Sequence, residues 1–188
     1  MQIIAGILKR KTLYYPKDLL RPTTDKVRGA IFNIIIANFP NIFDNASVCD
    51  IFAGAGAIGI EALSRGAKKI IFIENNKTVL KYLKENLTVL TDKTEVIPFD
   101  VQKALDIITT EKFDIIFLDP PYNKGLIEPT VKKISEYNMI NKQGIIVIEH
   151  HKKEIFSLPE NLAIFKKKEY SDTIITILQY KTQMNTAK

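Results

Sequence analysis

The sequence has little cysteine and histidine, and it has no tryptophan. Cys49 is the only cysteine among 188 residues, which excludes an internal disulfide, and its apolar neighbours indicate a core residue and not a nucleophile. With His150 and His151 as the only histidines, the sequence holds no zinc-type cluster, and we expect no bound metal. This cysteine usage favours a reducing, cytoplasmic location.

Long hydrophobic runs are also lacking. The apolar stretches are strand-sized, far below the ~20 residues that cross a bilayer, and the first residues lack the pattern of a signal peptide. With 46% hydrophobic and 26% charged residues, the chain has the balance of a soluble globular protein of one domain with a small appendage. We expect a monomer without a membrane partner.

The formal net charge is +6, and the basic residues are concentrated in the first 28 residues and again near 152–153 and 166–168. Such clusters displace counterions from phosphates, so the charge is compatible with a polyanionic partner. Many basic proteins bind no nucleic acid, and the charge alone therefore does not identify the partner.

Strand-like and helix-like segments alternate regularly from residue 47 onward. This alternation predicts an α/β fold with a mostly parallel seven-stranded sheet, helices on both faces and an antiparallel C-terminal strand. The expected strands are 47–52, 70–73, 94–97, 113–118, 144–149, 162–168 and 173–180, and the expected helices are 57–65, 77–90, 101–109 and 126–137.

The residues before this region are expected to form an extension. Ile3–Ala5 and Leu13–Tyr15 have the pattern of a β-hairpin around a basic turn. Thr24 is a suitable N-cap for a helix whose apolar residues keep helical spacing. We therefore divide the chain into an N-terminal hairpin and loop, residues 1–22, and a main domain, residues 23–182.

A glycine-rich loop, Gly54-Ala55-Gly56-Ala57-Ile58-Gly59, follows the first strand of the alternating region and opens a helix. Glu74 ends the next strand, twenty positions after Gly54. This is the pattern of a dinucleotide-binding fingerprint, in which the glycines allow a tight turn and the carboxylate binds ribose hydroxyls. The loop therefore predicts a nucleoside cofactor.

Asp50 discriminates between nucleoside cofactors. It lies four residues before Gly54, where a pyrophosphate would meet its carboxylate in an unfavourable anion–anion contact. S-adenosylmethionine (SAM) carries an ammonium and a sulfonium, and Asp50 can accept from that ammonium. Charge therefore favours SAM over NAD. The cofactor-binding residues that we expect are Asp50, Phe52, Gly54, Gly56, Glu74, Asn75, Asp100 and Val101.

Two of these residues have separate expected roles. Glu74 is expected to bind the ribose diol. Asp100 is placed to accept from the adenine amine, with Val101 offering a backbone N–H, but Asp100 is equally well placed to cap the helix that follows it.

Asp119-Pro120-Pro121-Tyr122 follows the buried-strand pattern of residues 113–118. The prolines fix the backbone just beyond the strand, where ligands bind in open α/β sheets. The Asp119 carboxylate and the Pro120 carbonyl can each accept one N–H of an exocyclic amine, while Tyr122 stacks on the base, a contact worth about 1–3 kcal/mol. The loop therefore indicates methyl transfer to an unpaired or flipped base. The alternative is an ordinary proline turn with a solvated Asp and a packing Tyr.

Glu149-His150-His151 ends a strand at the same edge of the predicted sheet. We interpret the histidines as solvated strand-end residues and not as a catalytic base, because the proton of a ring amine can leave after transfer without one. Glu149 is the residue of the three that we expect to contact the site.

A tetrapeptide of the form Asp/Asn-Pro-Pro-Tyr/Phe behind a SAM-type glycine loop marks amino-group methyltransferases. More narrowly, the chain resembles the RsmD family, bacterial methyltransferases of a guanine N2 in 16S small-subunit rRNA. The resemblance covers nearly the whole chain, and its most specific parts are the Arg-Pro-Thr-Thr block and the Ala-Leu-Ser-Arg-Gly-Ala segment. The matching stretches are Ile3–Gly6, Arg21–Arg28, Asp50–Ala67 and Phe113–Tyr122.

The resemblance implies a Rossmann-like SAM-methyltransferase fold, SAM as cofactor, and small-subunit rRNA or an assembling small ribosomal subunit as partner. It assigns Asp119, Pro120, Pro121 and Tyr122 to the target base, and it places Arg21, Thr23 and Thr24 at the mouth of the site. With the basic N-terminal block, the expected RNA-binding residues are Arg10, Lys11, Arg21, Thr23, Thr24 and Arg28.

The chain departs from the family pattern at three points. The family usually carries a glycine where Arg10 or Lys11 stands, which affects the shape of the N-terminal hairpin. A common serine is replaced by Ala55, and the C-terminal tail is short.

Other functions remain open from the sequence. An adenine-N6 DNA methyltransferase or a protein-glutamine methyltransferase would use the same chemistry, although the chain has no long target-recognition segment. From other classes, an NAD-dependent oxidoreductase and a non-catalytic RNA-binding module are the rivals. Guanine over adenine depends on the family resemblance, because the tetrapeptide serves both bases. The sequence identifies neither the nucleotide nor whether the substrate is naked rRNA or a particle.

Overall fold

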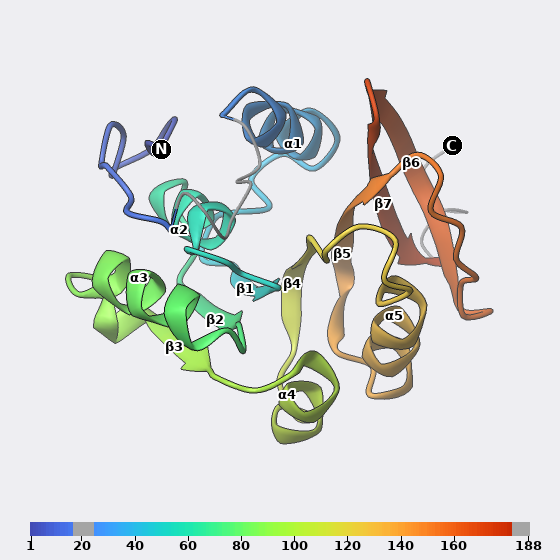
Figure 1. The fold of residues 1–188 in the computed structure, drawn as a ribbon. Helices are drawn as coiled ribbons and strands as arrows, with labels where there is room; N and C mark the ends of the chain where they lie inside the picture. Colours follow the sequence, from blue (N-terminus) through green and yellow to red (C-terminus); the bar gives the residue numbers. More distant parts are fainter. Residues whose placement is uncertain (17–24, 182–188) are drawn as a thin grey trace.

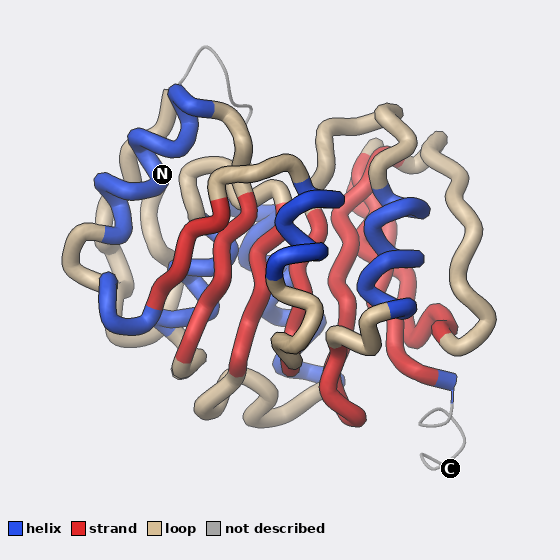
Figure 2. The backbone as a smooth tube through the Cα atoms, turned by 90° about the horizontal axis from the view of Figure 1, so that it is seen from below, coloured by secondary structure: helices blue, strands red, loops and turns tan. Residues whose placement is uncertain are grey.

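The computed structural model describes residues 1–16 and 25–181. They form one seven-stranded sheet with the strand order β3-β2-β1-β4-β5-β7-β6 and with helices on both faces (Figures 1 and 2). The strands are β1 (Ser47–Ile51), β2 (Lys69–Ile73), β3 (Thr94–Ile97), β4 (Phe113–Leu118), β5 (Ile140–His151), β6 (Leu162–Tyr170) and β7 (Thr173–Tyr180). The helices are α1 (Asp25–Asn38), α2 (Ala57–Ser64), α3 (Lys77–Leu87), α4 (Val101–Ile107) and α5 (Ile127–Glu136), with a 3-10 turn, η1 (Thr91–Lys93).

Strands β1 to β5 run parallel, and a helix connects each of them to the next along the chain. β7 lies between β5 and β6 and is antiparallel to both. This confirms the predicted mixed sheet and its antiparallel C-terminal strand. Because β1, β2 and β4 are parallel neighbours, their carboxyl ends meet at one edge of the sheet, where ligands of open α/β folds bind.

Two apolar cores hold the helices on the sheet. α1, α2 and α3 pack on one face around Phe32, Phe72 and Phe117, and α4 and α5 pack on the other face with Leu118 (Figure 1). Consecutive residues of β4 thus enter opposite cores, as expected for a strand buried on both faces. Cys49 is fully buried in the second core, which confirms that it is a core residue. Within residues 1–16 and 25–181, no helix is long and apolar enough to cross a membrane.

The strands and helices expected from residue 47 onward are present, with ends shifted by up to a few residues. β5 differs most, since it begins at Ile140 and not at 144. An irregularity in its pairing with β4, between Phe113 and Ile115, lets this first segment join the sheet. At Gly144 an added Cβ would lie 2.9 Å from the Phe113 carbonyl oxygen, so glycine permits the close approach of the two backbones.

The N-terminal segment forms a short hairpin, as expected: the N–H groups of Ile3 and Leu13 donate to the carbonyls of Lys11 and Met1 at 3.0 and 2.9 Å, around an antiparallel bridge between Gln2 and Thr12. The hairpin is also fixed to α2. The backbone N–H groups of Ile4 and Ala5 donate to the buried carboxylate of Glu61 at 2.7 and 3.0 Å. A buried charge needs such partners, and the segment therefore satisfies a polar group inside the main fold.

Arg28 of α1 takes part in the same contact. Its side chain is fully buried, donates to Asp25 at 3.0 Å and to the carbonyl of Gln2, and lies 4.0 Å from Glu61. An RNA contact requires a charge at the surface. The structure therefore disagrees with the predicted RNA contact, because this guanidinium anchors the N-terminal segment. Thr24, the expected N-cap of α1, lies outside the described residues.

The backbone conformation of Arg10 explains why the family usually carries a glycine at this point of the N-terminal segment. Its φ of 71° lies in the left-handed region, where a Cβ is strained and glycine is not. We expect Arg10→Gly to raise the free energy of unfolding by about 0.5–1 kcal/mol in urea titrations, because relief of strain exceeds the added chain entropy. Lys11→Gly is the matched control, because Lys11 has no positive φ, and it is expected to destabilise the protein. Equal effects of the two changes would contradict this explanation.

Candidate active site

Three carboxylates converge at the carboxyl edge of the sheet. Asp50 belongs to β1, and Glu74 and Asp119 directly follow β2 and β4. Burial raises the pKa of Asp50 to about 8; the Gly59 N–H opposes this rise, and the charges of Asp119 and Glu74 add to it. The carboxylates are thus close enough to repel one another. An edge with this many acceptors suits a cationic ligand.

Asp50 is held in place by the first turn of α2. Its Oδ2 accepts from the Gly59 N–H at 2.8 Å, and the side chain is 2% exposed. An added Cβ at Gly59 would lie 2.3 Å from the Phe72 ring and 3.0 Å from Oδ2 of Asp50. The last glycine of the loop is therefore needed for the close approach of α2 to the sheet, as in dinucleotide-binding folds.

The glycine loop turns through left-handed backbone at Phe52, Gly54 and Gly56, with φ values of 64°, 56° and 85°. For Phe52, which has a bulky side chain, this conformation is strained, and such strain is concentrated at ligand-binding sites. At Gly56 an added Cβ would lie 2.6 Å from Leu83 of α3. The loop is thus shaped by its backbone and closely covered by the neighbouring helix.

Glu74 ties the loop to the start of α3. Its Oε2 accepts from the Gly54 N–H at 3.0 Å, and its Oε1 accepts from the N–H groups of Asn75 and Asn76 at 2.9 and 2.8 Å. These bonds fix the carboxylate beside the glycine loop, where a ribose contact was expected. Asn76 then caps α3 by accepting from the Thr78 N–H at 2.9 Å.

Asp100 is the N-cap of α4, since its Oδ1 accepts from the Lys103 N–H at 3.1 Å. The capping interpretation is therefore confirmed, and the adenine contact stays a prediction. Val101, the first residue of α4, is buried at the same end of the helix. The structure thus fixes both residues next to the carboxyl end of β3.

The Asp119–Tyr122 loop leaves β4 beside β1. The Asp119 N–H donates to the carbonyl of Ile51 at 3.4 Å, so the loop stays joined to β1 one residue past the strand. Asp119 is half-buried and Pro120 is buried, whereas Pro121 and Tyr122 are exposed. The loop therefore presents an aromatic ring to solvent, close in the chain to the hydrogen-bond acceptors of Asp119 and Pro120.

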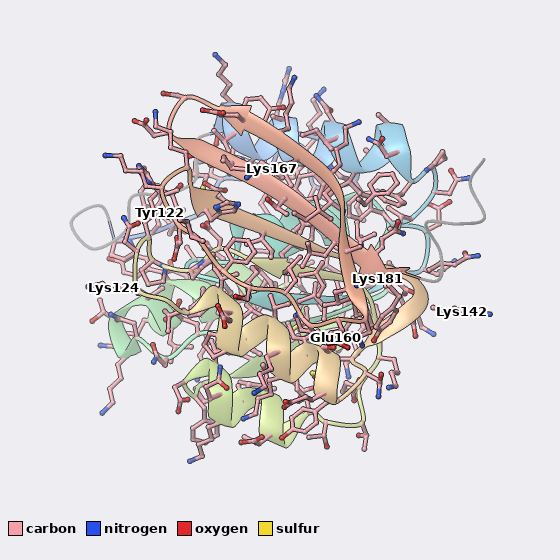
Figure 3. All side chains as sticks on the ribbon, turned by 90° about the vertical axis from the view of Figure 1, so that its right-hand side faces the viewer. Tyr122, Lys124, Lys142, Glu160, Lys167 and Lys181 are labelled. Carbon is pink, nitrogen blue, oxygen red and sulfur yellow. The ribbon has the colours of Figure 1, made fainter. Side chains whose placement is uncertain are left out.

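Tyr122 is connected to the C-terminal strands, and Figure 3 shows it at the end of the sheet opposite to Lys142 and Lys181. Its hydroxyl lies 3.2 Å from Oε1 of Glu149 and 3.0 Å from Oγ1 of Thr173. Burial raises the pKa of this hydroxyl to about 12, the bond with Thr173 lowers it, and the charges of Glu149 and Asp119 raise it further. The prediction that Glu149 contacts the site is consistent with this bond.

The two histidines differ from the expected solvated residues. His150 is 2% exposed, and its Nε2 lies 2.9 Å from the Thr176 hydroxyl, so the solvated interpretation is wrong for this residue. Burial lowers its pKa. His151 is half-buried, its ring centroid lies 5.7 Å from that of Tyr122, and its Nδ1 accepts from the Lys153 N–H at 3.2 Å.

Comparison with known proteins identifies the family. A family model described as Conserved hypothetical protein 95 matches residues 1–179. Ribosomal RNA small subunit methyltransferase D of Haemophilus influenzae is 36% identical over 173 residues, which are 89% of this chain and 88% of the relative. The chain belongs to the RsmD family.

Further relatives agree with this family. The Escherichia coli protein of the same name is 31% identical, over 97% of this chain and 91% of its own length. The solved structure of Escherichia coli yhhF superposes with a TM-score of 0.81 at 27% identity, and covers 96% of this chain and 97% of that one. The Rossmann-like methyltransferase fold expected from the sequence is therefore confirmed.

The predicted RNA-binding residues of this RsmD family member differ in their exposure to solvent. Arg10 is exposed and Lys11 is half-buried, both in the N-terminal segment. Arg28 is buried, as described above. The remaining predicted residues, Arg21, Thr23 and Thr24, lie outside the described residues.

Two residues that contact the site, Thr173 and Asn86, have no signal in the sequence motifs. The Thr173 hydroxyl reaches Tyr122 from β7, 51 positions away along the chain. Asn86 of α3 accepts from the Tyr14 N–H at 2.9 Å, and its amide donates to the carbonyls of Tyr14 and of Ala55 in the glycine loop. Gly59 could have been found, because the fingerprint includes it as its last glycine.

Proposed function

We propose that the protein transfers a methyl group from SAM to the exocyclic N2 of a guanine in small-subunit rRNA. The observation that carries the proposal is the convergence of Asp50, Glu74 and Asp119 at one edge of the sheet, beside an exposed aromatic ring. Such an acceptor-rich edge favours a cationic cofactor and an amine substrate, and it disfavours a pyrophosphate.

The residues present fit SAM. The buried Asp50 carboxylate gains a partner when it accepts from an ammonium, and this offsets the burial that raises its pKa. Glu74, fixed beside the glycine loop, would accept from the ribose diol. Asp100 would accept from the adenine amine, and the Val101 N–H would donate to a ring nitrogen of adenine. When bound, SAM supplies a methyl group activated by a sulfonium.

The target amine is proposed to bind at Asp119 and Pro120. A nucleobase amine is a poor nucleophile because its lone pair is delocalised into the ring. Acceptance of one N–H by the Asp119 carboxylate and of the other by the Pro120 carbonyl localises that lone pair and orients it. Tyr122 stacks on the base, which must be unpaired or flipped to reach this loop.

The rRNA substrate is proposed from the family, since the relatives named above are ribosomal RNA small subunit methyltransferases. We propose that residues 1–22 extend the RNA-binding surface of a methyltransferase domain formed by residues 23–182. Support comes from the exposed Arg10 and from Tyr14, whose backbone is linked through Asn86 to the glycine loop. A basic segment beside the site would contact phosphates around the target base.

The test is methyl transfer from labelled SAM to rRNA, and to small subunits that lack the modification, followed by mass spectrometry of the nucleosides. We expect N2-methylguanosine as the product. Methylated adenine or a methylated glutamine side chain would replace this assignment with another amino-group methyltransferase. Calorimetry with S-adenosylhomocysteine and NADH completes the test, and binding of NADH alone would overturn the SAM assignment. A protein that binds RNA but transfers no methyl group would be a non-catalytic RNA-binding module.

A further inference from the structure

The Tyr122 side chain is held by two strands that do not belong to its own loop. Its hydroxyl lies 3.2 Å from Oε1 of Glu149 on β5 and 3.0 Å from Oγ1 of Thr173 on β7, and its ring lies against His151. Figure 3 shows Tyr122 beside the C-terminal strands at this end of the sheet. The loop that follows β4 is thus tied to β5 and β7.

The direction of these hydrogen bonds follows from the chemistry of the partners. The Tyr122 hydroxyl donates to Oε1 of Glu149. Tyr122 has one hydroxyl proton, and Thr173 must therefore donate to the Tyr122 oxygen. The Tyr122 hydroxyl is protonated at neutral pH, as it would be at its ordinary pKa of 10, and burial raises this pKa to about 12.

The two partners of Tyr122 are themselves rigidly placed. Glu149 is 6% exposed and pairs with Ile175 in the centre of the β5–β7 ladder. Thr173 is the first residue of β7, and the preceding turn is joined to β5 by the Lys152 N–H, which donates to the Asp172 carbonyl at 2.9 Å. The side chains of the same two residues form an ion pair of 2.7 Å, which adds to this link.

We propose that Glu149 and Thr173 are positioning residues that orient the Tyr122 ring as a stacking platform for the target base. This inference rests on the proposed methyl transfer to an RNA base. The prolines fix the backbone of the loop but not the side chain of Tyr122, which is 37% exposed in a turn. A ring that is oriented before the base arrives loses less freedom on binding, so its hydroxyl bonds favour productive binding of RNA.

The kinetic test compares Thr173→Val and Glu149→Ala with their conservative forms, Thr173→Ser and Glu149→Gln. We expect the first two to lower kcat/KM for RNA by roughly 5- to 10-fold without changing the affinity for S-adenosylhomocysteine, and the conservative forms to restore most of it. Thr176→Val is the matched control, because Thr176 lies on the same strand but contacts His150, and kcat/KM should stay unchanged.

A double-mutant cycle with Tyr122→Phe, which keeps the ring and removes the hydroxyl, isolates the mechanism. If the hydroxyl bonds orient the ring, Thr173→Val has no further effect in the Tyr122→Phe background. If Thr173→Val lowers kcat/KM by the same factor in both backgrounds, the proposal is overturned. The Thr173 arm keeps the test valid even if Glu149→Ala does not fold, because Thr173→Val removes no buried charge.

A readout without activity separates this proposal from the proposed function. In the wild-type protein, NMR of labelled tyrosine should show magnetisation transfer between the Tyr122 ring and His151, and this transfer should be lost in Thr173→Val. Retention of the transfer in the variant contradicts the positioning role. A wild-type protein that shows the transfer but methylates no RNA contradicts the proposed function instead.

Discussion

Replacing Asp119 by alanine should lower kcat for methyl transfer by about 100- to 1000-fold, the range found when one polar group that stabilises a transition state is removed. The physical reason is that Asp119 supplies one of the two acceptors proposed for the target amine. The affinity for S-adenosylhomocysteine, measured by calorimetry, should not fall. Loss of the Asp119 charge in fact relieves repulsion at Asp50, whose pKa it helps to raise.

Asp119→Asn is the control that separates hydrogen bonding from charge. Asparagine keeps one carbonyl oxygen that accepts from the amine, and the tetrapeptides of amino-group methyltransferases carry Asp or Asn at this position. We expect this variant to be at least roughly tenfold more active than Asp119→Ala. Full activity of the alanine variant would remove Asp119 from the mechanism, and equal activity of both variants would show that charge and not hydrogen bonding is decisive.

The site residues that the sequence predicts best are those placed by parallel topology. Asp50, Glu74 and Asp119 end or follow three strands separated by helices, and parallel neighbours bring such ends to one edge whatever their distance along the chain. Their convergence therefore needs only the alternation of strands and helices. The glycine loop is predictable for the same reason, since its spacing is fixed by one strand, one turn and one helix.

The contacts that the sequence does not predict depend on packing across the sheet. The contact of Thr173 with Tyr122 requires that β7 is inserted between β5 and β6, an order that no local pattern specifies. Arg28 belongs to a basic block, and a basic residue type predicts an exposed side chain. Its burial depends on tertiary partners that no local pattern specifies, the carbonyl of Gln2 and, at 4.0 Å, the carboxylate of Glu61 in α2. The contact of the N-terminal hairpin with α2 could not be predicted for the same reason, because the N–H groups of Ile4 and Ala5 reach a carboxylate 57 and 56 positions away along the chain.

The binding of S-adenosylhomocysteine should release a proton from Asp50. The pKa of Asp50 is raised to about 8, chiefly by burial, so the carboxyl is protonated in most free molecules at pH 6.5. An ammonium partner favours the ionised form, and binding then expels the proton. Between pH 6 and 7 the affinity should rise by up to roughly tenfold per pH unit, and calorimetry in two buffers with different ionisation enthalpies should show release of about one proton. The ligand ammonium is itself charged in this range, because an α-amino group has a pKa of about 8.

Asp50→Asn is the matched variant, and it also tests the effect of Asp50 on stability. For an acid whose pKa is higher in the folded than in the unfolded protein, the folded state binds more protons between the two values, here 3.8 and about 8. Asp50 therefore makes the protein less stable as the pH rises through this window. Relative to Asp50→Asn, the wild type should lose on the order of 3 kcal/mol of unfolding free energy between pH 5 and 8.

Asparagine still accepts from Gly59 but cannot ionise, so the variant should show no proton release and much weaker ligand binding. A variant that binds S-adenosylhomocysteine as tightly as the wild type would exclude Asp50 from the cofactor site. If urea titrations gave parallel pH profiles for the two proteins, the raised pKa of Asp50 would be contradicted, because the carboxyl would then ionise equally in the folded and unfolded states.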